Sequence, residues 1–116
     1  MNLDDPFNLN ERIEALEKHR DELNAATDAI TRSMASHIET LRLYEEGGCE
    51  PGSCTRSILE GDVFMAIRRA DINTRQLLGD IVLWIVQNLP LGSYGSRAKV
   101  DAWIRMRRQE EAAKHG

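Results

Sequence analysis

The sequence predicts an all-α protein with two long heptad-patterned helices and a short third helix at the end. The three prolines stand at positions 6, 51 and 90, so two long stretches lack the strongest helix breaker. Within each stretch, residues at alternating spacings of four and three form a mainly apolar seam, which is the pattern of one helix packed along another. The chain has 116 residues, and residues 1–116 are expected to form a single helical domain.

The first helix is expected over residues 9–46. Asn8 and Glu11 have the spacing of a capping box, in which the two side chains satisfy free backbone amides of the first turn. Gly47 and Gly48 readily take the left-handed conformation that ends a helix. The heptad positions of this helix are Leu9, Ile13, Leu16, Arg20, Leu23, Thr27, Ile30, Met34, His37, Leu41 and Tyr44.

A loop is expected over residues 47–56, where Pro51-Gly52 suits the centre of a type II turn. Ser57 and Glu60 repeat the capping-box spacing, so a second helix is expected over residues 57–89. Asp71 offers an alternative, because it could cap a separate helix and split this one, but the unbroken heptad phase favours continuity. The heptad positions are Val63, Ile67, Ala70, Thr74, Leu77, Ile81, Trp84 and Asn88.

Two helices joined by a short loop are expected to pack as an antiparallel hairpin, in which the numbers of facing residues add up to about 104. Several of these layers contain a polar residue, which weakens a core but fixes its register. The expected layers are Leu41 with Val63, His37 with Ile67, Met34 with Ala70, Ile30 with Thr74, Thr27 with Leu77, Leu23 with Ile81, and Arg20 with Trp84.

The hairpin has more apolar surface than it covers. Residues 77–86 are apolar on nearly every side, and such a helix must be covered on more than one face. After a Gly/Ser joint at residues 90–96, a third helix over residues 97–114 is expected to cover part of this surface. The remainder predicts a homo-oligomer, either a dimer or a larger bundle. The third helix is expected to cover the surface with Val100, Trp103 and Ile104. The first helix also carries a ridge of small residues outside its seam, which consists of Ala25, Ala29, Ser33 and Ser36. The expected interface residues are Leu77, Leu78, Val82, Trp84, Ile85, Trp103, Ala25 and Ala29.

The charge distribution narrows the classes of partner. The net charge is −4, but residues 1–50 contain 12 acidic and 5 basic side chains, whereas residues 51–116 contain 7 and 10. An acidic half disfavours nucleic acid and anionic lipid, since both are polyanions. Residues 1–5 lack the features of a signal peptide, and the longest apolar stretch, residues 77–89, is too short to span a bilayer. We therefore expect a cytoplasmic protein with no membrane contact.

Two candidate polar sites lie on the first helix. Glu11, Glu14 and Glu17 form a row of carboxylates of the kind that holds metal ions in helical bundles, but the facing positions supply no further acid. A solvated helix face is the favoured interpretation, with no metal and no cofactor.

His37 occupies a seam position, where it is either a proton-linked switch or, as we favour, a histidine hydrogen-bonded within the core. No serine or cysteine has a base beside it in a known catalytic motif, so no catalytic residue and no enzyme are predicted.

The Gly-rich segment 92–96 could hold a phosphate group with its backbone amides and the cations that follow it. A flexible joint with Ser96 as the helix cap is the favoured alternative. Trp103 among the terminal arginines could stack a base, but Glu110 and Glu111 dilute the positive charge. The candidate anion ligands are Ser93, Tyr94, Ser96, Arg97, Lys99, Arg105 and Arg108.

Cys49 and Cys54 flank the Pro-Gly turn and could close a small disulfide or supply half of a zinc site. Free thiols are favoured in a cytosolic loop.

These observations favour a non-enzymatic protein–protein interaction module, an oligomeric helical bundle that acts as an adaptor or inhibitor. Small acidic helical proteins of this kind include virus-encoded inhibitors of host defence complexes. The alternative is a sponge or sensor for a nucleotide or another anion, with a site formed by residues 92–99 and the C-terminal arginines. The sequence resembles no family closely enough to name one.

Overall fold

A computed structural model describes residues 8–115, and every regular element among them is helical. The elements in order are α1 (Leu9–Gly47), α2 (Ser53–Leu59), α3 (Val63–Arg69), α4 (Ile72–Asn88), the 3₁₀ turn η1 (Leu91–Ser93) and α5 (Arg97–His115). The all-α prediction is therefore confirmed. Residues 1–5, considered above for a signal peptide, lie outside the described residues.

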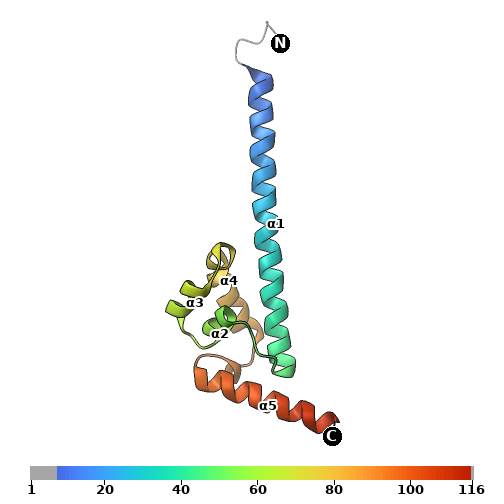
Figure 1. Ribbon diagram of the computed structural model, residues 1–116, viewed down its shortest axis with the longest axis vertical. Helices are drawn as coiled ribbons and strands as arrows, with labels where there is room; N and C mark the ends of the chain where they lie inside the picture. Colours follow the sequence, from blue (N-terminus) through green and yellow to red (C-terminus); the bar gives the residue numbers. More distant parts are fainter. Residues whose placement is uncertain (1–7, 116) are drawn as a thin grey trace.

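The molecule consists of a long single helix with a small helical body at its C-terminal end (Figure 1). Helices α2, α3 and α4 lie beside the second half of α1, and α5 crosses below its end. The first half of α1 projects away from the body, so the molecule is 79 Å long but only 32 Å and 21 Å in its other two dimensions. We call residues 9–28 the stem and the rest of the described chain the body.

Helix α1 begins and ends close to the expected residues. Asn8 precedes it in a left-handed conformation (φ 52°) and makes no side-chain capping bond, so the predicted capping box with Glu11 is not formed. At the other end Gly48 is left-handed (φ 65°), and its N–H points back to the carbonyls of Leu43 and Tyr44. This glycine stop agrees with the prediction from the sequence.

The predicted continuous helix over residues 57–89 is wrong, because this stretch contains three helices. Gly61 takes a positive φ of 77° after α2, and the Asp62 side chain then caps α3 by accepting a bond from the Met65 amide (3.1 Å). The Asp71 side chain caps α4 by accepting a hydrogen bond from the Thr74 amide (2.8 Å). A separate helix capped by Asp71 was the alternative to the continuous helix that the heptad phase favoured.

The predicted capping box of Ser57 and Glu60 is also wrong. Ser57 lies inside α2, where its hydroxyl donates to the Ser53 carbonyl, and Glu60 follows the end of α2 and pairs with Arg56.

The core of the body forms around the second half of α1. Leu41 and Tyr44 of α1 are fully buried against Leu77, Ile81 and Ile85 of α4 and against α2 and α5. From α5, Val100, Trp103 and Ile104 are buried in the same cluster, as the sequence predicts. Two hydrogen bonds fix this end: the Tyr44 hydroxyl donates to the Ser93 carbonyl (2.5 Å), and Trp103 Nε1–H donates to the Tyr44 carbonyl (3.2 Å). Burial raises the pKa of the Tyr44 phenol, so this hydroxyl stays a donor.

The expected antiparallel pairing of α1 with the second segment is not observed. His37 contacts Thr74 instead of Ile67, and Tyr44 contacts Ser93 just beyond the end of α4. Helix α4 therefore runs in the same sense as α1 (Figure 1), because the short α2 and α3 reverse the chain twice before α4 begins. Thr27, Leu23 and Arg20, which the hairpin pairs with Leu77, Ile81 and Trp84, are exposed on the stem.

Arg56 of α2 ties three segments of the body together. Its guanidinium pairs with Glu50 in the loop after α1 (2.6 Å), with Glu60 (3.2 Å) and with Asp101 of α5. The Arg56 side chain is only 19% exposed, so these pairs are better shielded from water than ordinary surface ion pairs.

Candidate functional site

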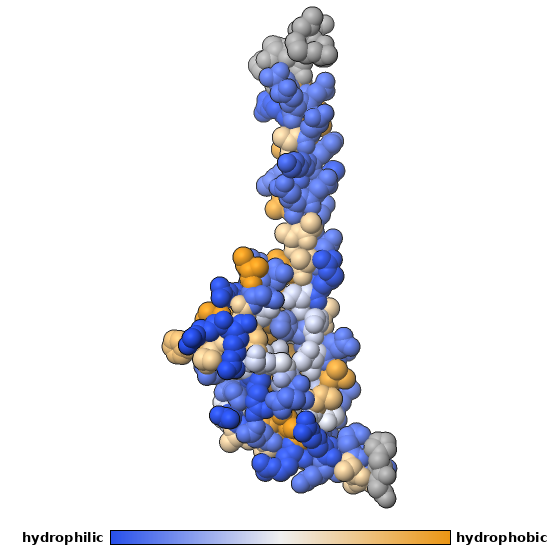
Figure 2. Space-filling view, viewed as in Figure 1, coloured by the Kyte–Doolittle hydropathy of each residue, from blue (hydrophilic) through white to orange (hydrophobic). Residues whose placement is uncertain are grey.

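The stem exposes an apolar seam along its whole length. Every residue from 9 to 28 is exposed, and the exposed fractions of Leu9, Ile13, Leu16 and Leu23 are 51%, 50%, 68% and 54%. Figure 2 shows hydrophobic side chains at intervals along the otherwise hydrophilic stem. These four residues occupy the heptad positions of the sequence, so they share one face of the helix.

The same seam is covered by the body in the second half of α1. Ile30 and Met34 pack against the core, His37 is hydrogen-bonded to α2 and α4, and Leu41 and Tyr44 are fully buried. One continuous seam is thus divided into a half that packs against the body and a half, residues 9–27, whose side chains are exposed. A helix of about 20 residues without tertiary contacts is marginally stable in water, so packing would stabilise the stem.

A second apolar surface is a groove of about 500 Å³ in the body. It lies between the turn that joins α2 to α3 and one side of α4, and Val63, Leu78, Val82 and Val86 form part of its walls. Gly79 also lines the groove, and a Cβ atom at this position would meet nothing within 4 Å. The surplus of apolar surface expected for residues 77–86 is therefore present on the exposed side of α4.

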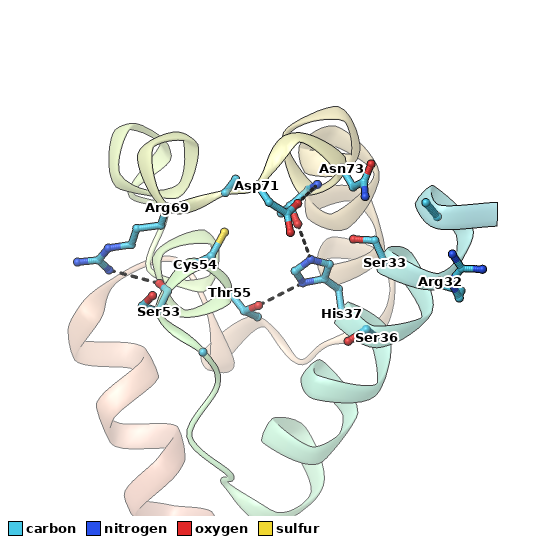
Figure 3. A pocket seen from close by; sticks show the side chains of 14 residues that line it. Arg32, Ser33, Ser36, His37, Ser53, Cys54, Thr55, Arg69, Asp71 and Asn73 are labelled. Atoms are coloured by element: carbon cyan, nitrogen blue, oxygen red, sulfur yellow. Dashed lines mark hydrogen bonds between the residues drawn. The ribbon is translucent and has the colours of Figure 1, made fainter. Parts of the chain in front are cut away.

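A polar pocket of about 670 Å³ lies where α1 meets α2 and the junction between α3 and α4 (Figure 3). His37 lies at its centre, held by the hydroxyls of Thr55 (Nδ1···Oγ1 3.3 Å) and Thr74 (Nε2···Oγ1 3.0 Å). Figure 3 shows that Arg32 and Arg69 point away from His37. Because no cation converges on its centre, the pocket does not resemble an anion site.

Part of the small-residue ridge of α1 contributes to this pocket. Ala29, Ser33 and Ser36 line the pocket, whereas Ala25 lies on the exposed stem.

The favoured interpretation of His37 as a hydrogen-bonded residue of a core layer agrees with its two threonine contacts. Burial lowers the pKa of His37 below its usual value of 6.5, and the Asp71 carboxylate opposes this shift. The folded protein therefore holds a neutral imidazole near pH 7, with each ring nitrogen engaged by a hydroxyl that can donate or accept.

This shift predicts the pH dependence of stability. Below about pH 6.5 the unfolded chain protonates His37 more readily than the folded chain does, so the free energy of unfolding falls as the pH is lowered. We expect a lower thermal midpoint at about pH 5.5 than at about pH 7.5. The His37→Gln variant should lose this part of the pH dependence, whereas His19→Gln, on the exposed stem, should retain it. An unchanged pH profile for His37→Gln, measured by circular dichroism melts, would contradict the assignment.

The two cysteines are not joined by a disulfide. Cys49 is exposed, and the Cys54 thiol points to the Ala66 carbonyl (3.6 Å). Burial raises the pKa of Cys54, and Asp71 acts in the same direction while Arg69 opposes both. A thiol that stays protonated is a poor nucleophile, although it lies in the same pocket as His37.

The structure does not gather the candidate anion ligands into one site. Ser93 is fully buried, its hydroxyl donates to the Pro90 carbonyl (2.6 Å), and its own carbonyl accepts the Tyr44 bond. Two backbone amides of the segment are also engaged, since Ser93 N–H donates to Pro90 and Gly95 N–H donates to Leu59 (2.7 Å). Two amides of the possible cradle are therefore used within the chain, and Ser93 is not available to a ligand.

The remaining candidates are spread along the surface. Ser96 caps α5 by accepting a bond from the Lys99 amide (3.2 Å), which is the favoured alternative from the sequence. Tyr94 is half-buried beside the core, and Arg97 and Lys99 are exposed. Arg105 and Arg108 line a shallow pocket further along α5. Arg107, not among the candidates, stacks on the Trp103 ring at 4.7 Å.

Three of the expected interface residues belong to the core of the body. Leu77, Ile85 and Trp103 are buried and cannot meet a partner without unfolding. Leu78 and Trp84 are partly buried against the core, and only Val82 and Ala25 are exposed. The stem residues Leu9, Ile13 and Leu16 are exposed but were not among the expected interface residues, because the sequence pattern assigned the seam to the contact with the second helix.

The row of Glu11, Glu14 and Glu17 lies on the stem, exposed to solvent. In the described part of the chain, histidine, cysteine and acidic side chains form no group of three placed to hold a metal ion.

None of the helices between residues 8 and 115 has the length and apolar character needed to cross a bilayer. No protein-family model matches the chain, and no curated protein or solved structure shows a significant similarity to it.

Proposed function

We propose that the chain is a non-enzymatic protein–protein interaction module that associates with itself through the stem. The observation that carries this proposal is the divided seam of α1, which the body covers from Ile30 onward and which is exposed from Leu9 to Thr27. A heptad seam becomes stable when a second helix packs along it, and the described chain supplies no such helix for the stem.

The expected association is weak and depends on concentration. Burying a half-exposed leucine or isoleucine side chain contributes about 1 kcal/mol, so four side chains per copy contribute about 8 kcal/mol in a dimer. Lost translational and rotational freedom offsets at least about 4 kcal/mol of this sum. Packing of the marginally stable helix adds a further favourable contribution. The first two terms leave about 4 kcal/mol, which corresponds to a dissociation constant on the order of 1 mM. Helix packing would lower this constant, and a larger bundle would bury more of the seam.

The body supports a binding role better than a catalytic one. His37 has both ring nitrogens engaged and the Cys54 thiol is protonated, so neither side chain of the polar pocket is an activated nucleophile or a free base. The anion sponge or sensor has less support, because the Gly-rich segment uses two of its amides internally.

The adaptor or inhibitor role rests on the two apolar surfaces of one chain. Self-association through the stem leaves the groove beside Gly79 free for a protein partner. The free thiols of Cys49 and Cys54 fit the reducing cytoplasm.

Sedimentation equilibrium tests the proposal over roughly 5–500 µM protein. The wild-type chain should become increasingly dimeric or larger, whereas a variant with Leu16→Asp and Leu23→Asp should stay monomeric, because four carboxylates would enter the seam of each dimer. Both substitutions lie on the exposed stem, so the near-ultraviolet circular dichroism of the body should not change.

Ala15→Asp is the control, since it adds one carboxylate of the same kind to an exposed position outside the seam and should leave association unchanged. Ala25→Asp probes the small-residue ridge separately. A wild-type chain that stays monomeric at every concentration, or an Ala15→Asp variant that dissociates as completely as the seam variant, would overturn the proposal.

A further inference from the structure

We propose that the partner of the stem is the stem of a second copy of this chain, packed antiparallel over residues 9–27. This inference rests on the proposed function and adds to it the identity, direction and register of the partner.

The body of each copy limits where a second helix can lie. From Ile30 onward, the seam is occupied by the copy's own α2, α4 and α5, so a second helix has access only to residues 9–27. The junction between α3 and α4 stands at this limit, because Ala70 and Asp71 line the same pocket as Ala29. A partner helix must therefore end near Thr27.

A second stem satisfies this limit when it runs in the opposite direction. Its helix begins at Leu9, so Leu9 of the second copy then lies beside Thr27 of the first stem, and the second body lies on the far side of Leu9 of the first stem. In a parallel pair, both bodies lie at the same end on the seam side of their own helices. The two helices would have to separate at the point where each body begins, and the bodies would compete for the same space.

In the antiparallel arrangement, the exposed seams of the two copies overlap over their whole length. Numbers of facing residues add up to about 36, which places a residue of one heptad class against a residue of the other class in every layer. The layers are Leu9 with Thr27, Ile13 with Leu23, and Leu16 with Arg20 of the second copy, and the symmetry of the dimer repeats each of them.

Arg20 also distinguishes the two directions. In a parallel pair, the two Arg20 side chains would face each other in one layer, and this like-charge contact is unfavourable. In the antiparallel pair, Arg20 lies across from Leu16 of the second copy. Its aliphatic part can lie along this leucine while the guanidinium reaches solvent, where it is 68% exposed in the single chain.

Thiol cross-linking tests the direction. Cys49→Ser and Cys54→Ser provide a background without native thiols, into which Leu9→Cys or Thr27→Cys is introduced separately. In the antiparallel pair Leu9 lies beside Thr27, whereas two Leu9 residues are about 27 Å apart at 1.5 Å per residue. Mild oxidation of an equimolar mixture should therefore give mainly the mixed disulfide dimer, and each variant alone should stay largely monomeric on a non-reducing gel.

A parallel pair gives the opposite result, because each variant alone would form a disulfide with its own copy. That outcome would overturn the antiparallel arrangement and leave the proposed function intact. Sedimentation of the background protein distinguishes a failure of the arrangement from a failure of self-association. If the background protein is dimeric but the mixture forms no cross-link, the register is wrong. If the background protein is monomeric, the proposed self-association is wrong. A monomeric chain that binds an unrelated helical protein through the stem would overturn the second copy as the partner.

Discussion

Replacing Gly48 with valine is expected to lower the free energy of unfolding by about 3 kcal/mol or more. Gly48 has a φ of 65°, a conformation that a β-branched residue rarely adopts. A Cβ atom here would lie 2.8 Å from the Ile104 carbonyl oxygen and 2.9 Å from the Arg107 Cβ. Helix α5 would have to move away from the end of α1, which would weaken the bond from Trp103 to the Tyr44 carbonyl.

Chemical denaturation followed by circular dichroism measures this loss. Gly47→Ala is the matched control, because Gly47 is the last residue of α1 and a Cβ there would meet only the Cys49 Sγ at 3.8 Å. We expect this control to be neutral or slightly stabilising, since alanine favours a helix over glycine. A Gly48→Val variant as stable as Gly47→Ala would show that α5 does not pack against the end of α1 as described.

Replacing Ile81 with alanine is expected to cost about 3 kcal/mol. Ile81 is completely inaccessible to solvent on the face of α4 that packs against α1, in the cluster that contains Leu41 and Tyr44. Removing three carbon atoms from such a position loses their transfer free energy and leaves a cavity, because the surrounding helices relax only partly.

Val82→Ala is the control for this prediction. Val82 is the next residue on α4 but is 48% exposed, so the same kind of truncation should cost less than about 1 kcal/mol. Equal losses for the two variants would contradict the orientation of α4.

The heptad seam of α1 could be read from the sequence, but its partner could not. Leu9 to Tyr44 keep one phase through the whole helix, and this regularity indicates a packed face. The pattern is the same whether a residue meets its own chain, as Leu41 does, or only solvent, as Leu16 does. Hydrophobic periodicity reports which side of a helix is apolar and contains no information about what covers it.

The breaks in the second segment were visible as local signals that periodicity outweighed. Gly61-Asp62 combines a residue suited to positive φ with a cap, and Asp71 is a second cap. The heptad spacing, which starts at Val63, crosses the break at Asp71 without interruption, because this turn is short enough to keep the apolar residues in phase. Satisfying the free amides at Met65 and Thr74 proved more important than heptad continuity.

By itself, the sequence determined the helical class, the extent of α1, the glycine that ends it and the burial of Val100, Trp103 and Ile104 by the last helix. These features depend on local propensity, capping and periodicity, which act within a few turns. The tertiary structure alone decided the direction of α4, the burial of Ser93 and the division of the α1 seam between Thr27 and Ile30. Each of these depends on where short helices reverse the chain, and small differences in turn geometry there move a whole helix from one face of α1 to another.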